Sequence, residues 1–247
     1  ADLGLVCATD LYEGWYGLGV YEGKQYTNVR VIGFLTIGPS QWVALKGSGI
    51  HSIYDLVGKK VAVGKPGAVT TVIGERILEE AGIKDQVEIV YLFGDAAVTA
   101  LRDGHIDCMH MCVGVPTPAI EEITTIKDCV FVEIPSEVIN RLLEKYPTYV
   151  PYTIPKDTYR GLDYDYHTVG IPNFLCCRAD LPEDVVYEIA SLIYSDDGIQ
   201  FLNTVHAATK AILTIDNPTK APIPLHPGAI KYWQERGITI EAPSPEE

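Results

Sequence analysis

The chain has 247 residues, of which 47% are hydrophobic and 21% are charged. This length is enough for one large α/β unit or two lobes, and the composition is ordinary for a folded globular protein. The formal net charge of −14 argues against nucleic acid and anionic membranes as partners, because both repel an acidic surface. No run of roughly 18 apolar residues is present, so the sequence predicts no transmembrane helix.

Apolar runs separated by turn residues predict alternating strands and helices in the first half of the chain. A short strand is expected at 3–8, and a long apolar segment at 29–45 is interrupted by Gly38-Pro39. Three βα units follow, which indicate a parallel sheet covered by helices. Their strands are expected at 60–63, 87–92 and 106–112, and their helices at 70–81, 95–103 and 118–124.

The second half adds a strand at 130–134 and an amphipathic helix at 136–145. The segment 147–166 is rich in Tyr, Pro and Asp and is expected to be irregular. A second long apolar strand is expected at 169–177. Three C-terminal helices are then predicted at 182–194, 198–213 and 227–236.

Two long strands that join two α/β lobes are typical of the two-lobed, type II periplasmic-binding-protein-like fold. We therefore expect an α/β protein with parallel-rich sheets and two crossing strands at a hinge. One lobe is expected to contain 1–44 plus 168–247, and the other 45–167. In this venus-flytrap plan a ligand lies in the cleft between the lobes and drives hinge closure.

The most informative local pattern is a buried strand that runs into a Gly-Pro-Gly turn and then a helix. A helix start has free backbone N–H groups and the positive end of the helix dipole, which suit an anion. In an open α/β sheet such a turn lies at the carboxyl end of a strand, where ligands bind. Alternatively, the hydroxyls of Thr70 and Thr71, at the start of the helix, cap that helix. The predicted anion-binding residues are Gly67, Ala68, Val69, Thr70 and Thr71.

Three residues near the start of the chain are further ligand-binding candidates. Thr9 and Asp10 are expected to end the first strand, where Asp10 would bind a ligand ammonium group or cap the following helix. Tyr12 has an apolar ring and a polar tip, so it would form a pocket wall or pack on the surface. Trp15 and Tyr16 have the same two alternatives.

Three more candidates lie beyond the Gly38-Pro39 interruption. Gln41 is expected to bond a ligand in the hinge or to make a structural hydrogen bond there. Val115 and Pro116 follow a predicted parallel strand. Their backbone would complete the binding site, or the prolines at 116 and 118 would only set the start of a helix.

The sequence predicts no metal site, no cofactor and no catalytic residue. Cys108, His110 and Cys112 share one face of a strand, but the two cysteines are expected about 13 Å apart. One zinc ion with bonds of about 2.3 Å cannot reach both, so these residues are interpreted as core. The sequence also lacks the HExxH, Walker A and GxSxG patterns.

Seven segments spread over nearly the whole chain resemble the TAXI-type substrate-binding proteins of TRAP transporters. They are ADLGLVCATD, SIYDLVGKKVAVGKPG, ALRDGHIDC, VGVPTPAIEEI, LLEKYPTYVPYTIPKDTYRG, TVGIPNFLCCRADLPEDVVY and PIPLHPGAIKYW.

The resemblance implies an extracytoplasmic receptor, periplasmic or anchored on the outer side of the inner membrane. Such a receptor captures a small carboxylate, similar to glutamate, glutamine or a dicarboxylate, in the interlobe cleft. It delivers this ligand to the membrane subunits of a TRAP permease. The resemblance implies transport and amino-acid or carboxylate binding without catalysis.

The chain departs from the family pattern in two places. The family's usual first strand, Gly/Ser-rich loop and helix have no counterpart before Ala1, so the first lobe is expected to be incomplete. The family's PGSGT turn is replaced here by Pro66-Gly67-Ala68-Val69-Thr70. A positive φ at Val69 would be costly for a β-branched residue. The changed turn favours a generic carboxylate over glutamate itself.

Two other functions remain open from the sequence. An enzyme on the same scaffold would use the same helix start as a phosphate site, but Asp10 is the only acid placed at a strand end. The ligand-sensing domain of a regulator would need a DNA-binding module, which the sequence does not show.

Overall fold

The computed structural model describes residues 1–213 and 215–244. The α-helices are α1 (Ala8–Tyr16), α2 (Val69–Glu80), α3 (Asp95–Arg102), α4 (Pro118–Ile126), α5 (Ser136–Lys145), α6 (Glu183–Ile193), α7 (Asp196–Val205) and α8 (Pro227–Glu235). The β-strands are β1 (Leu3–Cys7), β2 (Val29–Leu45), β3 (Lys60–Ala62), β4 (Glu88–Val90), β5 (Cys108–Cys112), β6 (Cys129–Phe131), β7 (Val150–Ile154) and β8 (Tyr166–Arg178).

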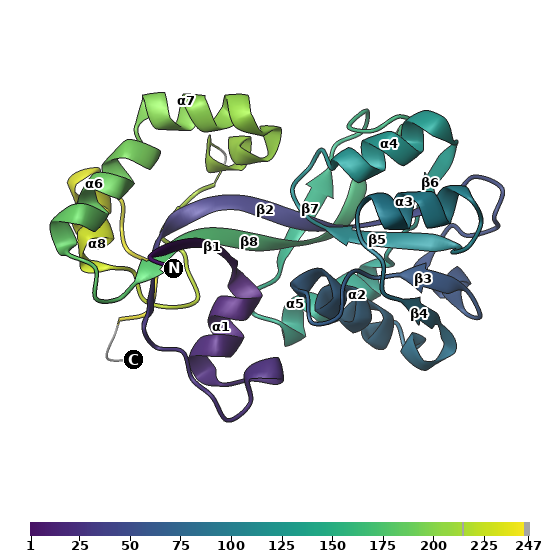
Figure 1. Cartoon of the computed structure of the whole chain (residues 1–247), viewed down its shortest axis with the longest axis horizontal. Helices are drawn as coiled ribbons and strands as arrows, with labels where there is room; N and C mark the ends of the chain where they lie inside the picture. The colour runs from purple at the N-terminus through teal and green to yellow at the C-terminus, as the bar shows by residue number, and fades with distance from the viewer. Residues whose placement is uncertain (214, 245–247) are drawn as a thin grey trace. The chain divides into compact units, whose positions relative to one another are not determined.

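Within the described residues, these strands form one open sheet of mixed direction (Figure 1). The order is β1-β8-β2-β5-β3-β4, with β6 paired to β2 and β7 paired to β8. β3 is parallel to β4 and β5, whereas β2 is antiparallel to β5 and β6, and β8 is antiparallel to β1 and β7. The α/β class is confirmed. The expectation of a parallel-rich sheet is wrong, because the two long strands, β2 and β8, are antiparallel to β5, β6, β1 and β7.

The chain divides into two compact units. Unit 1 contains Ala1–Ile37 and Ile171–Glu247, and unit 2 contains Gly38–Gly170. β2 and β8 each contribute residues to both units, as expected for the two crossing strands. The expected boundaries at 44/45 and 167/168 are shifted, because the stretch 40–44 of β2 pairs with β5 inside unit 2.

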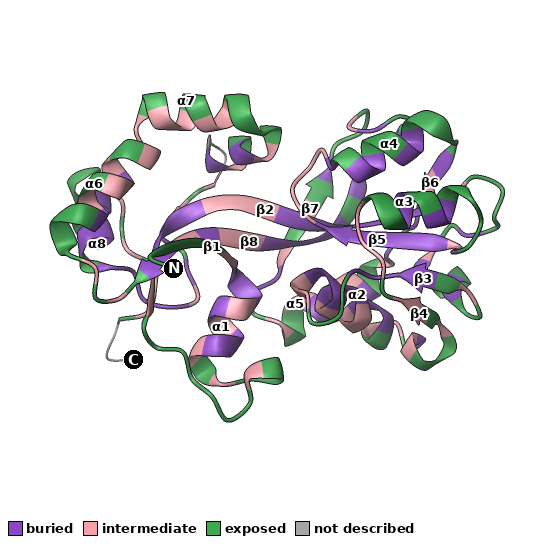
Figure 2. Ribbon diagram, viewed as in Figure 1, coloured by how far each residue is buried: buried purple, intermediate pink, exposed green. Residues whose placement is uncertain are grey.

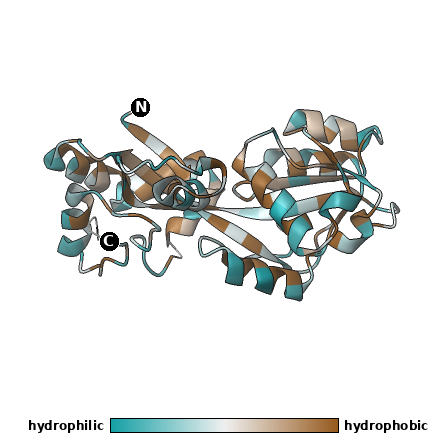
Figure 3. Ribbon diagram, turned by 90° about the horizontal axis from the view of Figure 1, so that it is seen from below, coloured by the Kyte–Doolittle hydropathy of each residue, from teal (hydrophilic) through white to brown (hydrophobic). Residues whose placement is uncertain are grey.

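Unit 2 is a sheet with helices on both faces. Helices α3 and α4 pack together over one face, and α2 and α5 pack together over the other (Figure 1). β5 is buried along its whole length (Figure 2). It lies between β2 and β3 in the sheet, and α2 covers it on one face and α3 on the other. Figure 3, seen from below, shows hydrophilic residues on the helices of unit 2 that face the viewer. This amphipathic pattern is the one that the helical periodicity predicts.

Unit 1 combines β1 and the adjoining parts of β2 and β8 with α1, α6, α7 and α8. Its tightest helix contact joins α6 and α8. A Cβ atom at Gly228 of α8 would lie 2.2 Å from the carbonyl oxygen of Glu183 of α6, so only glycine allows this approach. Pro227 starts α8, a position where its fixed φ is favourable.

Two local expectations are corrected by the structure. The segment 147–166 contains β7, whose residues pair with the start of β8. Val150, Tyr152 and Thr153 favour strands, and the exposed Pro151 is tolerated because edge strands do not need every N–H group. The helix expected at 198–213 is two elements, α7 and a 3₁₀ segment at Ala207–Leu213.

Candidate functional site

The turn that opens α2 is built on glycine. It follows β3, and its positive φ angles fall at Gly64 (122°) and Gly67 (74°), where glycine is tolerated at no steric cost. Ala68 is the N-cap with an extended backbone, and Val69 is the first helical residue. The backbone strain considered for Val69 is therefore absent.

The first turn of α2 leaves two backbone donors open. The N–H groups of Thr71 and Val72 bond to the carbonyl oxygen of Ala68, at 2.9 and 3.2 Å. The N–H groups of Val69 and Thr70 have no acceptor within the part of the chain that the structure describes. The Ala68 side chain makes no capping hydrogen bond, since alanine carries no acceptor. The two amides are thus available to a ligand anion at the positive end of the helix dipole.

The hydroxyls of Thr70 and Thr71 are used inside the protein. Thr70 Oγ1 accepts a hydrogen bond from the N–H of Cys112 at 3.1 Å, and Thr71 Oγ1 donates to the carbonyl oxygen of Lys65 at 2.6 Å. Both threonines are buried. These contacts fasten α2 to the end of β5 and close the turn, which neither the ligand-binding nor the capping interpretation anticipated.

We expect Thr70→Val to lower the free energy of unfolding by about 1–3 kcal/mol, because the buried Cys112 amide loses the acceptor that Thr70 provides. Thr70→Ser keeps a hydroxyl at the same position and is the matched control. Urea unfolding of the three proteins measures the difference. Equal stability of the valine variant and the wild type would contradict the assignment of this hydroxyl.

The loop between β5 and α4 is held by a closed network of buried hydrogen bonds. Tyr159 donates its O–H to Gln41 Oε1 at 2.6 Å, and the N–H of Thr117 donates to the Tyr159 oxygen at 2.7 Å. Gln41 Nε2 donates to Thr117 Oγ1 at 3.0 Å and to the carbonyl oxygen of Val113 at 3.1 Å. Burial raises the pKa of Tyr159 to about 12, so this phenol keeps its proton.

Gln41 is therefore a support for the loop. Its side chain is fully buried, and its amide oxygen and nitrogen are both engaged within unit 2. This geometry matches the structural hydrogen bond that the sequence analysis gave as the alternative to a ligand contact. Val115 and Pro116 lie half-buried in the supported loop and are joined by a cis peptide bond.

The α2 turn and the β5–α4 loop lie at one edge of the sheet. Each follows the carboxyl end of a strand, and β3 and β5 are parallel neighbours. The hydrogen bond from Cys112 to Thr70 joins the two segments directly. Ligands of open α/β sheets bind at this edge. The structure thus brings Gly67, Ala68, Val69, Thr70 and Thr71 next to the end of β5, from which the 113–117 loop begins.

The other predicted residues belong to unit 1. Thr9 and Asp10 lie in the first turn of α1 and not at the end of a strand, because the helix begins at Ala8. Cys7 is the N-cap, and its Sγ accepts from the N–H of Asp10 at 3.4 Å. Asp10 is therefore not the helix cap. Tyr12 is half-buried, with its ring 4.8 Å from that of Tyr16.

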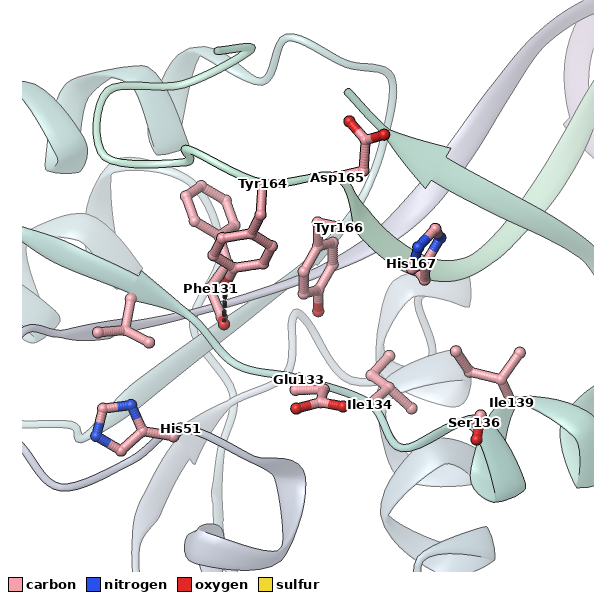
Figure 4. Close-up of a pocket in the computed structure, with 11 residues that line it drawn as sticks. His51, Phe131, Glu133, Ile134, Ser136, Ile139, Tyr164, Asp165, Tyr166 and His167 are labelled. Carbon is pink, nitrogen blue, oxygen red and sulfur yellow. Dashed lines mark hydrogen bonds between the residues drawn. The ribbon is translucent and has the colours of Figure 1, made fainter. Parts of the chain in front are cut away.

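A pocket of about 430 Å³ in unit 2 was not predicted from the sequence (Figure 4). It lies between the end of β6, the start of α5 and the start of β8. Tyr164 and Tyr166 donate their hydroxyls to the carbonyl oxygens of Phe131 and Val132. None of the predicted ligand-binding residues lines it. The lining residues are His51, Val130, Phe131, Glu133, Ile134, Ser136, Ile139, Tyr164, Asp165, Tyr166 and His167.

The pocket joins residues from distant segments, and no local motif links them. Residues 1–213 and 215–244 contain no group of three or more His, Cys, Asp or Glu side chains that could hold a metal ion. Nor does any helix in those residues combine the length and the apolar character that a membrane crossing needs.

Several solved structures with a similar fold are described as solute-binding proteins or hold small ligands. MatC from Rhodopseudomonas palustris, with bound malate, has a TM-score of 0.50 and 15% identity, over 86% of this chain and 67% of MatC. The periplasmic aliphatic sulphonate binding protein SsuA from Escherichia coli has a TM-score of 0.48 and 15% identity, over 86% of this chain. The chain spans 64% of the length of that SsuA structure.

The likeness to MatC supports the two-lobed α/β fold, and at this identity it concerns the fold alone. A sequence comparison identifies the family, because the sequence model of the NMT1-like family matches residues 1–237. The match includes both compact units, the α2 turn and the β5–α4 loop. On this evidence the chain belongs to the NMT1-like family.

Proposed function

We propose that this protein is a solute-binding receptor that captures a small carboxylate at the first turn of α2. The observation that carries the proposal is the pair of unpartnered N–H groups on Val69 and Thr70 beside an N-cap that supplies no side-chain acceptor. The turn lies at the carboxyl edge of the parallel strands, next to a loop that a buried network holds in place.

A carboxylate complements this turn in shape and charge. Its two oxygens can each accept one amide hydrogen bond, and hydrogen bonds to a charged group contribute about 1.5–3 kcal/mol each. The helix dipole adds a favourable term for an anion at the same position. The amides are not titratable and supply no general acid or base, so we propose binding and not catalysis.

The transport role is proposed from the resemblance to TAXI-type receptors. It favours an extracytoplasmic location and delivery of the ligand to the membrane subunits of a TRAP permease. A structural neighbour from Listeria monocytogenes is described as a putative L-cystine ABC transporter, and SsuA is described as periplasmic. MatC holds malate, a dicarboxylate of the class proposed here, but the proposal for this chain depends on its own amides.

Ala68→Asp tests the proposal. An aspartate at the N-cap accepts from the first-turn amides, so we expect helix α2 to be stabilised by about 0.5–2 kcal/mol. The same carboxylate occupies the ligand's donors and repels its charge. Isothermal titration with malate, glutamate and succinate is expected to show binding by the wild type and loss of at least about tenfold in affinity for the variant, a change of 1.4 kcal/mol or more.

Ala68→Asn is the matched control, because it caps the same amides without adding a charge. Its affinity is expected to fall between those of the wild type and Ala68→Asp. The proposal is contradicted when the wild type binds none of the carboxylates, or when Ala68→Asp binds them as tightly as the wild type does.

A further inference from the structure

Unit 1 contains a second, smaller pocket with a carboxylate among aromatic rings. Its volume is about 260 Å³, and it is lined by Asp10 and Leu11 of α1 and by Trp15, Tyr21 and Tyr26. Apart from Asp10 and the two phenols, the lining side chains are apolar or aromatic. The pocket is thus a partly apolar enclosure with one negative charge.

The aromatic side chains are arranged as walls. The rings of Tyr21 and Tyr26 meet edge to face, with centroids 5.7 Å apart and an interplanar angle of 76°. Trp15 lies on the same helix as Asp10, and its ring already receives one cation, the guanidinium of Arg30 at 5.1 Å from the centroid. The faces of such rings carry negative potential and attract cations.

Asp10 has no basic partner within the described residues. Its carboxylate accepts a hydrogen bond from the hydroxyl of Tyr21 at 3.3 Å, its N–H donates to Cys7 Sγ at 3.4 Å, and no Lys, Arg or His forms an ion pair with it. Arg30 directs its guanidinium to the carbonyl oxygens of Thr27 and Val29, both at 2.8 Å. A half-buried carboxylate normally finds a cation or several donors, because partial desolvation disfavours an unpaired charge.

The negative charge of Asp10 acts on its neighbour. Burial, together with the Asp10 carboxylate, raises the pKa of Tyr21 to about 12. Tyr21 therefore stays protonated and donates to Asp10 Oδ1. The environment stabilises a positive group in the pocket and disfavours a second negative one.

We propose that this pocket binds the ammonium group of a small organic cation, either a primary or a methylated amine. Asp10 supplies the countercharge, and the rings of Trp15, Tyr21 and Tyr26 surround the carbon-bound hydrogens of the cation. A hard metal ion does not fit the lining. Calcium takes six to eight oxygen ligands, whereas one carboxylate and two phenols are the oxygen-bearing side chains here.

This inference concerns unit 1 and does not depend on the carboxylate proposed for α2. The test is titration of the whole chain with tetramethylammonium chloride and with ethylammonium chloride. Binding is measured by calorimetry and by tryptophan fluorescence. Sodium chloride at the same ionic strength is the reference. Saturable binding of at least one ammonium salt is expected, and Asp10→Asn is expected to weaken it by at least about tenfold.

Glu22→Gln is the charge-matched control, because Glu22 is exposed, follows Tyr21 closely and does not line the pocket. It is expected to bind the ammonium salts as the wild type does. Tyr26→Leu is a second variant at a half-exposed wall, and it is also expected to weaken binding. Circular dichroism confirms that each variant is folded before titration.

The inference is overturned when the wild type shows no saturable response to either ammonium salt, or when Asp10→Asn and Tyr26→Leu bind as Glu22→Gln does. Malate titration of the same variants separates the two proposals, since its probe has the opposite charge. Tyr26→Leu is expected to leave malate binding unchanged, whereas Ala68→Asp is expected to weaken malate binding and to leave the ammonium response.

Discussion

Replacing His110 by glutamine is expected to flatten the decrease in stability of this protein between pH 7 and pH 5. His110 lies on β5 and is almost fully buried. Its Nε2 lies 3.0 Å from Ser40 Oγ, and its ring packs on Trp42 at a centroid distance of 4.4 Å. Its Nδ1 faces Gly74 of α2 and has no hydrogen-bond partner among residues 1–213 and 215–244. Protonation would place a charge in this uncharged surrounding, so burial lowers the pKa of His110 from 6.5 to about 3.

The sign of the effect follows from proton uptake on unfolding. In the unfolded chain the imidazole takes up a proton near pH 6.5, whereas in the folded protein it stays neutral down to about pH 3. The unfolded state therefore binds more protons in this window, and the free energy of unfolding decreases as the pH falls. The expected contribution is up to about 1.4 kcal/mol per pH unit, or about 2 kcal/mol between pH 7 and pH 5.

Urea unfolding at pH 7 and pH 5 measures this difference for the wild type and His110→Gln. His226 of unit 1 also has a pKa lowered by burial, so a smaller slope of the same sign is expected to remain. Asp55, whose pKa is lowered by the N–H groups of Ser52 and His51, titrates below this window. His105→Gln removes a histidine from an exposed position and is the control. Equal slopes for wild type and His110→Gln would contradict the assignment.

Most elements of unit 2 follow from local sequence patterns. The apolar spacing within 136–145 predicts a helix, and α5 has these bounds, with Val138 and Leu142 buried. The strand expected at 60–63 is found as β3 (Lys60–Ala62). Its apolar residues are completely buried, as the apolar run predicts. The sequence does not predict β7, because three prolines and several tyrosines in the segment 147–166 obscure its alternation. Its pairing with β8 is a tertiary contact that no local pattern encodes.

The candidate site was predictable only where its chemistry is local. The free amides of the α2 turn follow from its glycines, from the helix start and from the alanine N-cap, all of which the sequence shows. The direction of the Thr70 hydroxyl does not, because its partner Cys112 lies 42 residues away. The partners through which Gln41 holds the loop lie 72 to 118 residues away, so its supporting role required the folded structure.

The aromatic pocket of unit 1 shows the same limit. The sequence identifies Asp10 as a candidate and predicts Tyr12, Trp15 and Tyr16 as residues of a pocket wall. In the structure Tyr12 packs on Tyr16, and the lining rings are those of Trp15, Tyr21 and Tyr26. Helix α1 ends at Tyr16, and the chain then turns back. That return brings Tyr21 to Asp10, which periodicity along one helix cannot predict.

Replacing Gln41 by leucine is expected to lower the free energy of unfolding by about 3 kcal/mol. The substitution removes both the acceptor oxygen and the donor nitrogen of a buried side-chain amide. The substitution leaves the Tyr159 hydroxyl without its acceptor and the Val113 carbonyl oxygen without its side-chain donor. Each buried polar group that loses its partner costs about 1–3 kcal/mol. The 113–117 loop also loses its connection to β2, so weaker carboxylate binding is expected together with the loss of stability.

A double-mutant cycle with Tyr159→Phe distinguishes this network from simple loss of packing. Tyr159→Phe alone leaves Gln41 Oε1 and the Thr117 N–H without partners. In the double variant both the Tyr159 hydroxyl and the Gln41 amide are absent, so neither is left buried without the other as its hydrogen-bond partner. We expect the double variant to be more stable than the sum of the single effects predicts, by about 1 kcal/mol or more, as measured by urea unfolding. Strict additivity would show that the two side chains do not act together, and the support that Gln41 gives to the candidate site would then have to come from packing alone.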